Sequence, residues 1–179
     1  KTIKKPFAAE ELEALREGCK ELRDRALVEF LYSTGVRVSE LAALNVADIE
    51  MGKQELIVYG KGSKERKTYL TDSAKFYLRR YLQERDAKPD EPLFVTLDAP
   101  HDRLSVAGIQ YMLRQLGRRA GVTGVHPHRF RRTIATDLLN RGMPIEQVKE
   151  FLGHEKLDTT MIYCTVRAES VKASHRKYA

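Results

Sequence analysis

The densest group of side chains that could bind a phosphate lies in residues 126–133, where two histidines and three arginines stand close together. Proline suits the first position of a helix, so Pro127 predicts a helix start. At about 100° per residue, His128 and Arg131 then lie together beside the apolar stripe, whereas Arg129 projects about 160° away from Arg131. Such a pair could contact a phosphate, although a basic, solvated helix start with a capping histidine explains the same residues.

A second candidate is Arg37, which stands three residues before Glu40 in a tight joint between two predicted helices. A carboxylate at that spacing could hold the guanidinium fork in place for bidentate contact with a phosphate. An ordinary local ion pair is the alternative interpretation.

The third candidate is Lys61, which has a glycine on either side. Glycine lets a backbone approach a ligand closely. Further cationic side chains follow at Lys64, Arg66 and Lys67. A basic turn of this kind is either solvated or in contact with phosphates, and a protonated lysine that reaches into a groove could also donate a proton to a leaving group.

The last candidates, His154 and Tyr163, follow near the C-terminus. The segment 145–162, with Gly153 in its turn, also fits a helix-turn-helix. In that interpretation Tyr163 would be a core residue or a DNA-backbone contact. Cys164 is given no role, because no partner residue supports one.

Helical periodicity and capping residues predict the elements that must hold these side chains. Helices are expected over residues 8–20, 23–34, 39–44, from a cap at Asp72 or Ser73 to about 85, and over 105–121, 127–141, 145–152, 158–166 and 168–177. Two β-prone runs, residues 56–59 and 67–70, flank the glycine-rich turn and predict a hairpin. Residues 86–103 are predicted to be mostly loop, with a short strand at 93–95. The predicted fold class is therefore mainly α with a small antiparallel β-sheet (α+β), in a single domain over residues 1–179.

Composition narrows the classes of function. The formal net charge is +7 and the sequence pI is about 9.4, which makes a polyanion the first partner to consider. Hydrophobic residues make up 42%, so the composition is not that of a disordered chain. No apolar run approaches a membrane span or a signal peptide, and two distant cysteines exclude a disulfide scaffold and a cysteine-based zinc site, which together predict a cytoplasmic location. No carboxylate cluster suits magnesium and no Walker-type loop is present, so we expect no metal and no cofactor.

Four blocks, taken together and in this order, give the chain a family likeness. They are T-G-x-R-x-S-E-L at residues 34–41, G-K-G-x-K-x-R at 60–66, H-x-x-R-R-T-x-A-T at 128–136, and L-G-H followed by T-T-x-x-Y at 152–163. Over nearly its whole length the chain resembles the catalytic domain of the tyrosine recombinase (phage integrase) family, and especially its Xer-like members. The family's usual N-terminal DNA-clamping domain has no counterpart here, so we expect the chain to be a fragment of a larger protein.

The resemblance implies a role for each matching position. Arg37 and Arg131 would clamp the scissile phosphate, His128 and His154 would contact its oxygens or handle protons, Lys61 would be the general acid, Glu40 would support the site, and Tyr163 would be the nucleophile. Lys64, Arg66, Lys67, Arg129 and Arg132 are the expected DNA contacts. The implied reaction passes through a 3′-phosphotyrosyl intermediate, followed by strand exchange and religation without metal or ATP.

The resemblance also implies partners. These are double-stranded DNA and further copies of the chain in a tetramer on DNA, with a C-terminal tail, about residues 167–179, docking in trans. A helix-turn-helix regulator without enzymatic activity would explain the charge and residues 145–163, but not the Lys61 turn or the Arg37 block. An enzyme like a type IB topoisomerase, which relaxes DNA with the same site, is the second alternative.

Overall fold

The computed structural model describes residues 5–153 and 171–179, and most of these are helical. The helices are α1 (Ala9–Gly18), α2 (Leu22–Thr34), α3 (Val38–Ala43), α4 (Asp72–Glu84), α5 (Val106–Ala120), α6 (Pro127–Asn140) and α7 (Ile145–Leu152). Residues 171–178 form a further C-terminal helix, and two short 3-10 helices are η1 (Val46–Asp48) and η2 (Lys61–Ser63). The strands are β1 (Ile49–Glu50), β2 (Glu55–Tyr59) and β3 (Glu65–Tyr69). The predicted fold class, mainly α with a small antiparallel sheet, is confirmed.

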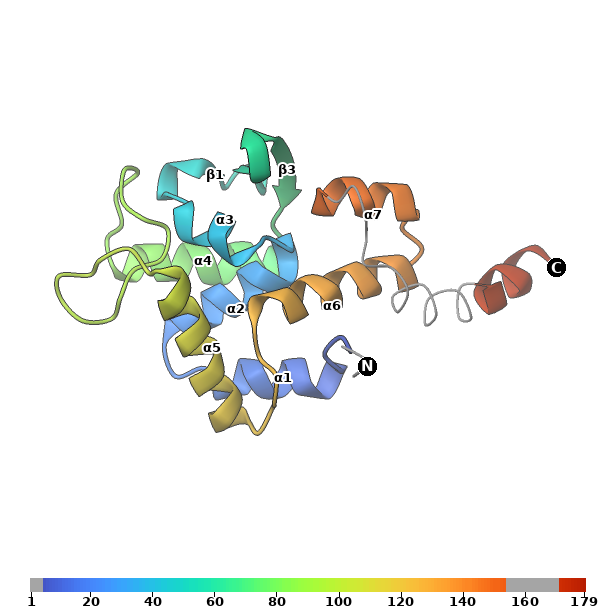
Figure 1. The fold of residues 1–179 in the computed structure, drawn as a ribbon, viewed down its shortest axis with the longest axis horizontal. Helices are drawn as coiled ribbons and strands as arrows, with labels where there is room; N and C mark the ends of the chain where they lie inside the picture. The colour runs from blue at the N-terminus through green and yellow to red at the C-terminus, as the bar shows by residue number, and fades with distance from the viewer. Residues whose placement is uncertain (1–4, 154–170) are drawn as a thin grey trace.

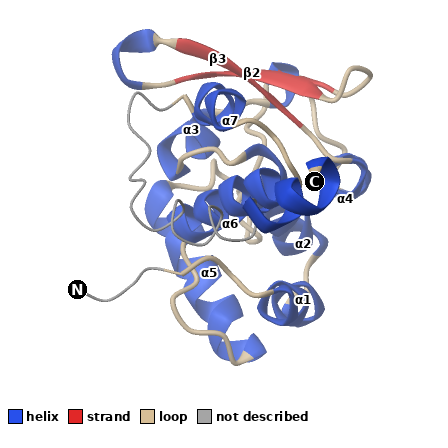
Figure 2. Ribbon diagram, turned by 90° about the vertical axis from the view of Figure 1, so that its right-hand side faces the viewer, coloured by secondary structure: helices blue, strands red, loops and turns tan. Residues whose placement is uncertain are grey.

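Helices α2 and α6 run through the centre of the molecule and pack against each other (Figure 1). Helices α1 and α5 lie together on one side of this pair, whereas the sheet, with α3 and α7 beneath it, lies on the opposite side (Figure 2). Helix α4 packs on α2. The end of α2 hydrogen-bonds to β3 through Ser33 and Thr34, and α7 also contacts β3. Among the described residues, no helix combines the length and the apolar surface needed to cross a membrane.

Local signals explain where several helices begin and end. Gly35 ends α2 in the left-handed conformation, with φ of 63°, as its glycine predicts. Pro127 occupies the start of α6, which confirms the helix predicted over residues 127–141 to within one residue. The cap of α4 differs from the prediction: the Thr71 hydroxyl, rather than Asp72 or Ser73, accepts a hydrogen bond from the Ala74 amide at 3.2 Å.

The sheet contains the predicted hairpin and one strand more. Its order is β1-β2-β3, with antiparallel pairing throughout. In the register of β2 and β3, Val58 lies opposite Arg66 and Tyr59 lies opposite Glu65. Strand β1 was not predicted because two residues are too short to show alternation. The strand predicted at residues 93–95 is not formed: Leu93 and Phe94 lie in bends, and Val95 makes an isolated bridge with Arg103.

The apolar core consists of two clusters. The larger one contains fully buried side chains of α2, α5 and α6, among them Phe30, Leu113 and Phe130. The smaller one joins α6 to α7 through Ala135, Leu139, Val148 and Leu152. The two clusters therefore fix α6 from both ends, which matters because α6 carries two of the candidate catalytic residues, His128 and Arg131. The helix predicted at 158–166 lies outside the described residues.

Candidate active site

A buried carboxylate, that of Glu40, organises the centre of the site. Its Oε1 accepts a hydrogen bond from the Arg37 backbone amide at 3.3 Å and from Arg37 Nη1 at 3.2 Å. Its Oε2 accepts a hydrogen bond from Arg66 Nη1. Glu40 is the third residue of α3, and Arg37 caps that helix, so the helix start sets the spacing of the pair. One carboxylate thus binds a guanidinium on each side, as the sequence predicts for Arg37 alone.

Arg66 is the second ligand of Glu40, and this placement differs from the DNA contact expected from the sequence. Its side chain is 9% exposed, and its Nε donates to the carbonyl oxygen of Phe151, in α7, at 3.2 Å. Its Nη2 is buried and has no hydrogen-bond partner among the described residues. Gly153, with φ of 68°, lies against the arginine stem so closely that a Cβ there would stand 2.6 Å from Arg66 Cδ. Arg66 therefore connects β3 to α3 and to the end of α7 through hydrogen bonds of a buried side chain.

Arg131 lies buried in α6, between the ends of two other helices. Its Nη1 donates to the Gly35 carbonyl at 2.5 Å and its Nη2 donates to the Leu152 carbonyl. Burial lowers the pKa of Arg131 to about 9, and the nearby charges of Arg37 and Arg66 act in the same direction, whereas Glu40 opposes them. Within the part of the chain that the structure describes, the guanidinium groups of Arg37, Arg66 and Arg131 thus lie near one another and near the Glu40 carboxylate.

The remaining candidates that the structure describes lie at the surface around this cluster. Lys61 is exposed in η2, where Gly62 has φ of 73° and the Gly60 amide donates to the Lys64 carbonyl at 2.8 Å. A Cβ at Gly60 would stand 4.0 Å from Arg37 Nη1, so the base of the turn lies beside Arg37. The turn that carries Lys61 therefore starts beside the arginine cluster.

Arg129 aside, all the remaining candidates on the hairpin and on α6 except Arg132 are exposed. Lys64 and Lys67 are exposed on the hairpin, and Lys67 Nζ lies 3.3 Å from Glu55 Oε1. His128 is exposed on the first turn of α6, and Arg132 is half-buried. His154 and Tyr163 lie outside the described residues.

Arg129 is the other residue whose placement differs from the expected DNA contact. Its Nε donates to the Lys5 carbonyl at 3.1 Å, its Nη1 donates to the Thr123 carbonyl at 2.6 Å, and its Nη2 lies 3.2 Å from Glu11 Oε1. All three nitrogens of the guanidinium are thus bound within the protein. The register of α6 is as predicted, since Arg129 and Arg131 point to different sides, but the side of Arg129 is covered by the chain itself.

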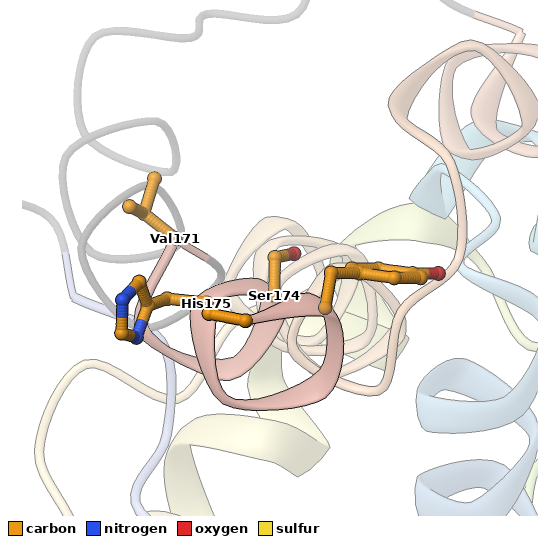
Figure 3. Close-up of a pocket in the computed structure, with 5 residues that line it drawn as sticks. Val171, Ser174 and His175 are labelled. Atoms are coloured by element: carbon orange, nitrogen blue, oxygen red, sulfur yellow. The ribbon is translucent and has the colours of Figure 1, made fainter.

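We also looked among the described residues for a metal site and for a hollow that could hold a ligand. Within residues 5–153 and 171–179, no group of three or more histidine, cysteine or acidic residues could hold a metal ion. An open hollow lies along the C-terminal helix and is lined by Val171, Ser174, His175, Tyr178 and Ala179 (Figure 3). None of these residues belongs to the arginine cluster around Glu40.

Comparison with known proteins agrees with the likeness seen in the motifs. The model of the phage integrase family matches residues 5–170. Tyrosine recombinase XerC of Listeria monocytogenes serotype 4b (strain F2365) is 39% identical over 189 aligned residues, which cover 98% of this chain and 62% of that protein. XerC of Leptospira interrogans serovar copenhageni (strain Fiocruz L1-130) is 36% identical over 185 aligned residues, 99% of this chain and 60% of that protein. The chain thus spans about three fifths of the length of these relatives.

Solved structures show the same fold. The crystal structure of XerA recombinase superposes with a TM-score of 0.82 at 30% identity and covers 95% of this chain and 63% of its own. XerH recombinase bound to a palindromic difH substrate, in a post-cleavage complex, gives a TM-score of 0.76 at 23% identity, over 97% of this chain and 53% of that one. The arginine cluster around Glu40, the mainly helical fold with its small sheet, and a family match over nearly the whole length lead to one conclusion: the chain belongs to the phage integrase family of tyrosine recombinases.

Proposed function

We propose that this chain is the catalytic domain of a site-specific DNA recombinase, which cuts and rejoins DNA through a covalent bond to Tyr163. The observation that carries the proposal is that Arg37, Arg66 and Arg131 gather around the carboxylate of Glu40. Fixed guanidinium groups suit a phosphodiester, whose non-bridging oxygens gain negative charge during attack.

The three arginines have different proposed roles. Arg37 is the more accessible, with 40% of its side chain exposed, and Glu40 holds its Nη1 while its other donors stay available. Arg131 is held by two carbonyl oxygens, which orient the guanidinium plane without cancelling its charge. Arg66 binds Oε2 of Glu40, the carboxylate oxygen that Arg37 does not bind, and its side chain is almost entirely buried, so its proposed role is to hold Glu40 in place. Arg37 and Arg131 are therefore the proposed clamp on the scissile phosphate, and Arg66 and Glu40 position them.

The proposed reaction exchanges one phosphoester for another. The hydroxyl oxygen of Tyr163 attacks the phosphorus and loses its proton to a nearby base, for which His128 and His154 are the candidates. The bond from phosphorus to the 5′ oxygen breaks, and Lys61 donates a proton to that oxygen. A 3′-phosphotyrosyl bond and a free 5′ hydroxyl result. A 5′ hydroxyl of another strand then attacks the phosphotyrosyl bond and frees Tyr163, so no ATP is consumed.

Double-stranded DNA is the proposed partner. The charge of +7 and the exposed cations of the hairpin turn support it. The related XerH structures contain a difH substrate, and a transposon integrase of the same fold is in complex with transposon DNA. Assembly of a tetramer on DNA, with the tail after Tyr163 docking in trans, is part of the same proposal and rests on the family likeness.

The test begins with covalent capture, because the target sequence has to be found first. A library of duplexes with random sequence, each nicked near its centre so that cleavage releases a short strand, is incubated with the protein. DNA that stays attached through denaturant is amplified and sequenced. We expect a defined target to be enriched, and we expect Tyr163→Phe to abolish the adduct while DNA binding remains.

The outcomes separate the alternatives. Binding without any adduct would support a regulator instead of an enzyme. An adduct that persists in Tyr163→Phe would move the nucleophile elsewhere, and Cys164 would be the next residue to replace. Strand exchange between two copies of the selected target separates recombination from topoisomerase-like relaxation.

A further inference from the structure

Residues 5–11, ahead of and within the first turn of α1, lie along α6 on the side away from Arg131. The Phe7 amide donates a hydrogen bond to the Thr133 hydroxyl at 2.9 Å, and that hydroxyl donates to the Arg129 carbonyl at 2.7 Å. The rings of Phe7 and Phe130 have centroids 4.9 Å apart, and both side chains are buried. We call residues 5–11 the strap.

Arg129 ties the strap to the start of α6. Its three nitrogens bind the Lys5 carbonyl, the Thr123 carbonyl and the Glu11 carboxylate, and its guanidinium carbon lies 4.2 Å from the centre of the Phe7 ring. The side chain is only 14% exposed. An arginine whose donors are all bound in different directions fixes geometry more tightly than a single ion pair does, because each bond restricts another rotation.

The first two turns of α6 are bound on both sides. The strap binds the side that carries Arg129, and Arg131, a residue of the proposed clamp, projects from the opposite side. His128 and Arg131 flank Arg129 in sequence, and Arg131 is fixed on its own side by carbonyls of α2 and α7. A helix is stiff over this distance, so a shift of its first turn moves both residues with it. In Figure 1 α1 lies directly below α6.

From this arrangement we propose that Arg129 is a positioning residue for the reaction: through the strap it fixes the first turn of α6, and thereby His128 and Arg131. The proposal rests on the function proposed above. It replaces the DNA contact expected from the sequence, and it gives Phe7, Glu11 and Thr133 the same task. A displacement of about 1 Å at reacting groups can cost on the order of 100-fold in rate.

The experiment compares Arg129→Met with a matched control, Arg16→Met. Arg16 also anchors α1: its Nε donates to Glu29 at 2.7 Å, its Nη1 binds Glu13, and its guanidinium carbon lies 5.6 Å from the centre of the Tyr32 ring. Its side chain is 21% exposed, which is close to that of Arg129, but its partners are on α1 and α2. Both variants keep the aliphatic stem and lose the charge, so a general loss of stability affects both.

Single-turnover cleavage is measured at saturating protein on the selected nicked duplex, together with the dissociation constant of the DNA. We expect Arg129→Met to slow cleavage about tenfold or more and to leave the dissociation constant and its salt dependence unchanged. Arg16→Met should leave the cleavage rate within about twofold of the original. Thr133→Val removes the hydrogen bond from the Phe7 amide, and also the hydroxyl's bond to the Arg129 carbonyl, but it leaves the Arg129 side chain in place. It should slow cleavage in the same way.

A second measurement needs no DNA. Hydrogen exchange of the free protein should speed up at the first turns of α6 in Arg129→Met and Thr133→Val, but not in Arg16→Met. If Arg129→Met lowers the salt dependence of binding and leaves exchange in α6 unchanged, Arg129 contacts DNA and the positioning role is wrong. If the original protein forms no adduct with any duplex, the proposed function fails and the positioning role fails with it, whereas normal cleavage by Arg129→Met overturns the positioning role alone.

Discussion

Replacing Arg66 with methionine tests whether this arginine is a buried tie or a DNA contact. Methionine keeps the stem that packs on Gly153 and removes the bonds to Glu40 and to the Phe151 carbonyl. Removing one partner of a buried ion pair costs about 3–5 kcal/mol. The cost is reduced because Glu40 keeps Arg37 and because the buried, unpartnered Nη2 disappears, which returns about 1–2 kcal/mol. The expected net loss in the free energy of unfolding is about 1–4 kcal/mol.

Urea denaturation measures this loss, and Lys67→Met is the matched control on the same strand. Lys67 has 49% of its side chain exposed and only a surface ion pair with Glu55, so its replacement should change stability by less than about 1 kcal/mol. For the salt dependence of DNA binding, the larger change is expected from Lys67→Met and not from Arg66→Met. If Lys67 contacts a phosphate, its loss lowers the slope by about 0.9, whereas Arg66→Met leaves the slope unchanged.

A double-mutant cycle with Glu40→Gln shows whether Arg66 acts through that carboxylate. The effects of the two substitutions on stability should couple by roughly 1–3 kcal/mol. Glu40→Gln removes the carboxylate charge, and Arg66→Met has already removed one of the two guanidinium groups that bind that carboxylate. Additive effects would mean that Arg66 and Glu40 act independently. If Arg66→Met keeps its stability and lowers the salt slope as Lys67→Met does, the buried tie is refuted and the expectation from the sequence is correct.

Four further outcomes are expected. Lys61→Ala should cleave the normal duplex slowly and be largely restored on a duplex whose bridging 5′ oxygen is replaced by sulfur, because a thiolate leaves without protonation; absence of rescue would move the general acid elsewhere. In that rescued system, where Lys61 no longer titrates, the cleavage rate should fall as pH rises through about 9, since Arg131 clamps the phosphate only while charged and its pKa is lowered by burial; a profile that stays flat to pH 10.5 would contradict this. Gly153→Ala should cost about 2 kcal/mol or more in urea denaturation, because its φ of 68° strains any other residue and the added Cβ would press on Arg66 at 2.6 Å. Deleting residues 168–179 should weaken assembly on DNA, measured by native gel shift, more than it weakens single-site binding, and unchanged assembly would argue against docking in trans.

The sequence predicted most helices because their signals are local. Gly35, Pro127 and the apolar spacing of α2 and α6 each act within a few residues, so they can be recognised without knowing the fold. Strand β1 has only two residues, which pair with Leu56 and Glu55, and at residues 93–95 Val95 alone forms a bridge, with Arg103. Segments this short show no alternation of apolar and polar residues, so a local pattern does not report their pairing. The cap of α4 was assigned one or two residues too late, because threonine, aspartate and serine stand together there and each can cap a helix.

The candidate site was predicted by residue type, and its burial was not. Arg37 and Glu40 were expected to pair because three residues separate them at a helix start. Arg66 was grouped with its exposed neighbours, although it shares the alternation of Thr68, which is fully buried. That parity is the signal that could have placed Arg66 on the inner face of the sheet. The position of Arg129 had no such signal, because its ligands come from residues 5–11 and 121–126, whose approach to α6 only the tertiary structure determines.

The two carbonyl ligands of Arg131 share a property of helices. Gly35 caps α2 and Leu152 is the last residue of α7, so the guanidinium lies at the C-terminal ends of both. The peptide dipoles of a helix leave about half a unit of negative charge at such an end, and two ends supply about the countercharge of one carboxylate. This countercharge belongs to the backbone: it does not titrate, it cannot swing away to pair with another cation, and no side-chain substitution removes it. At neutral pH this countercharge helps to keep the buried Arg131 charged and oriented, and in the proposed clamp it would leave the attraction of the guanidinium for a phosphate intact.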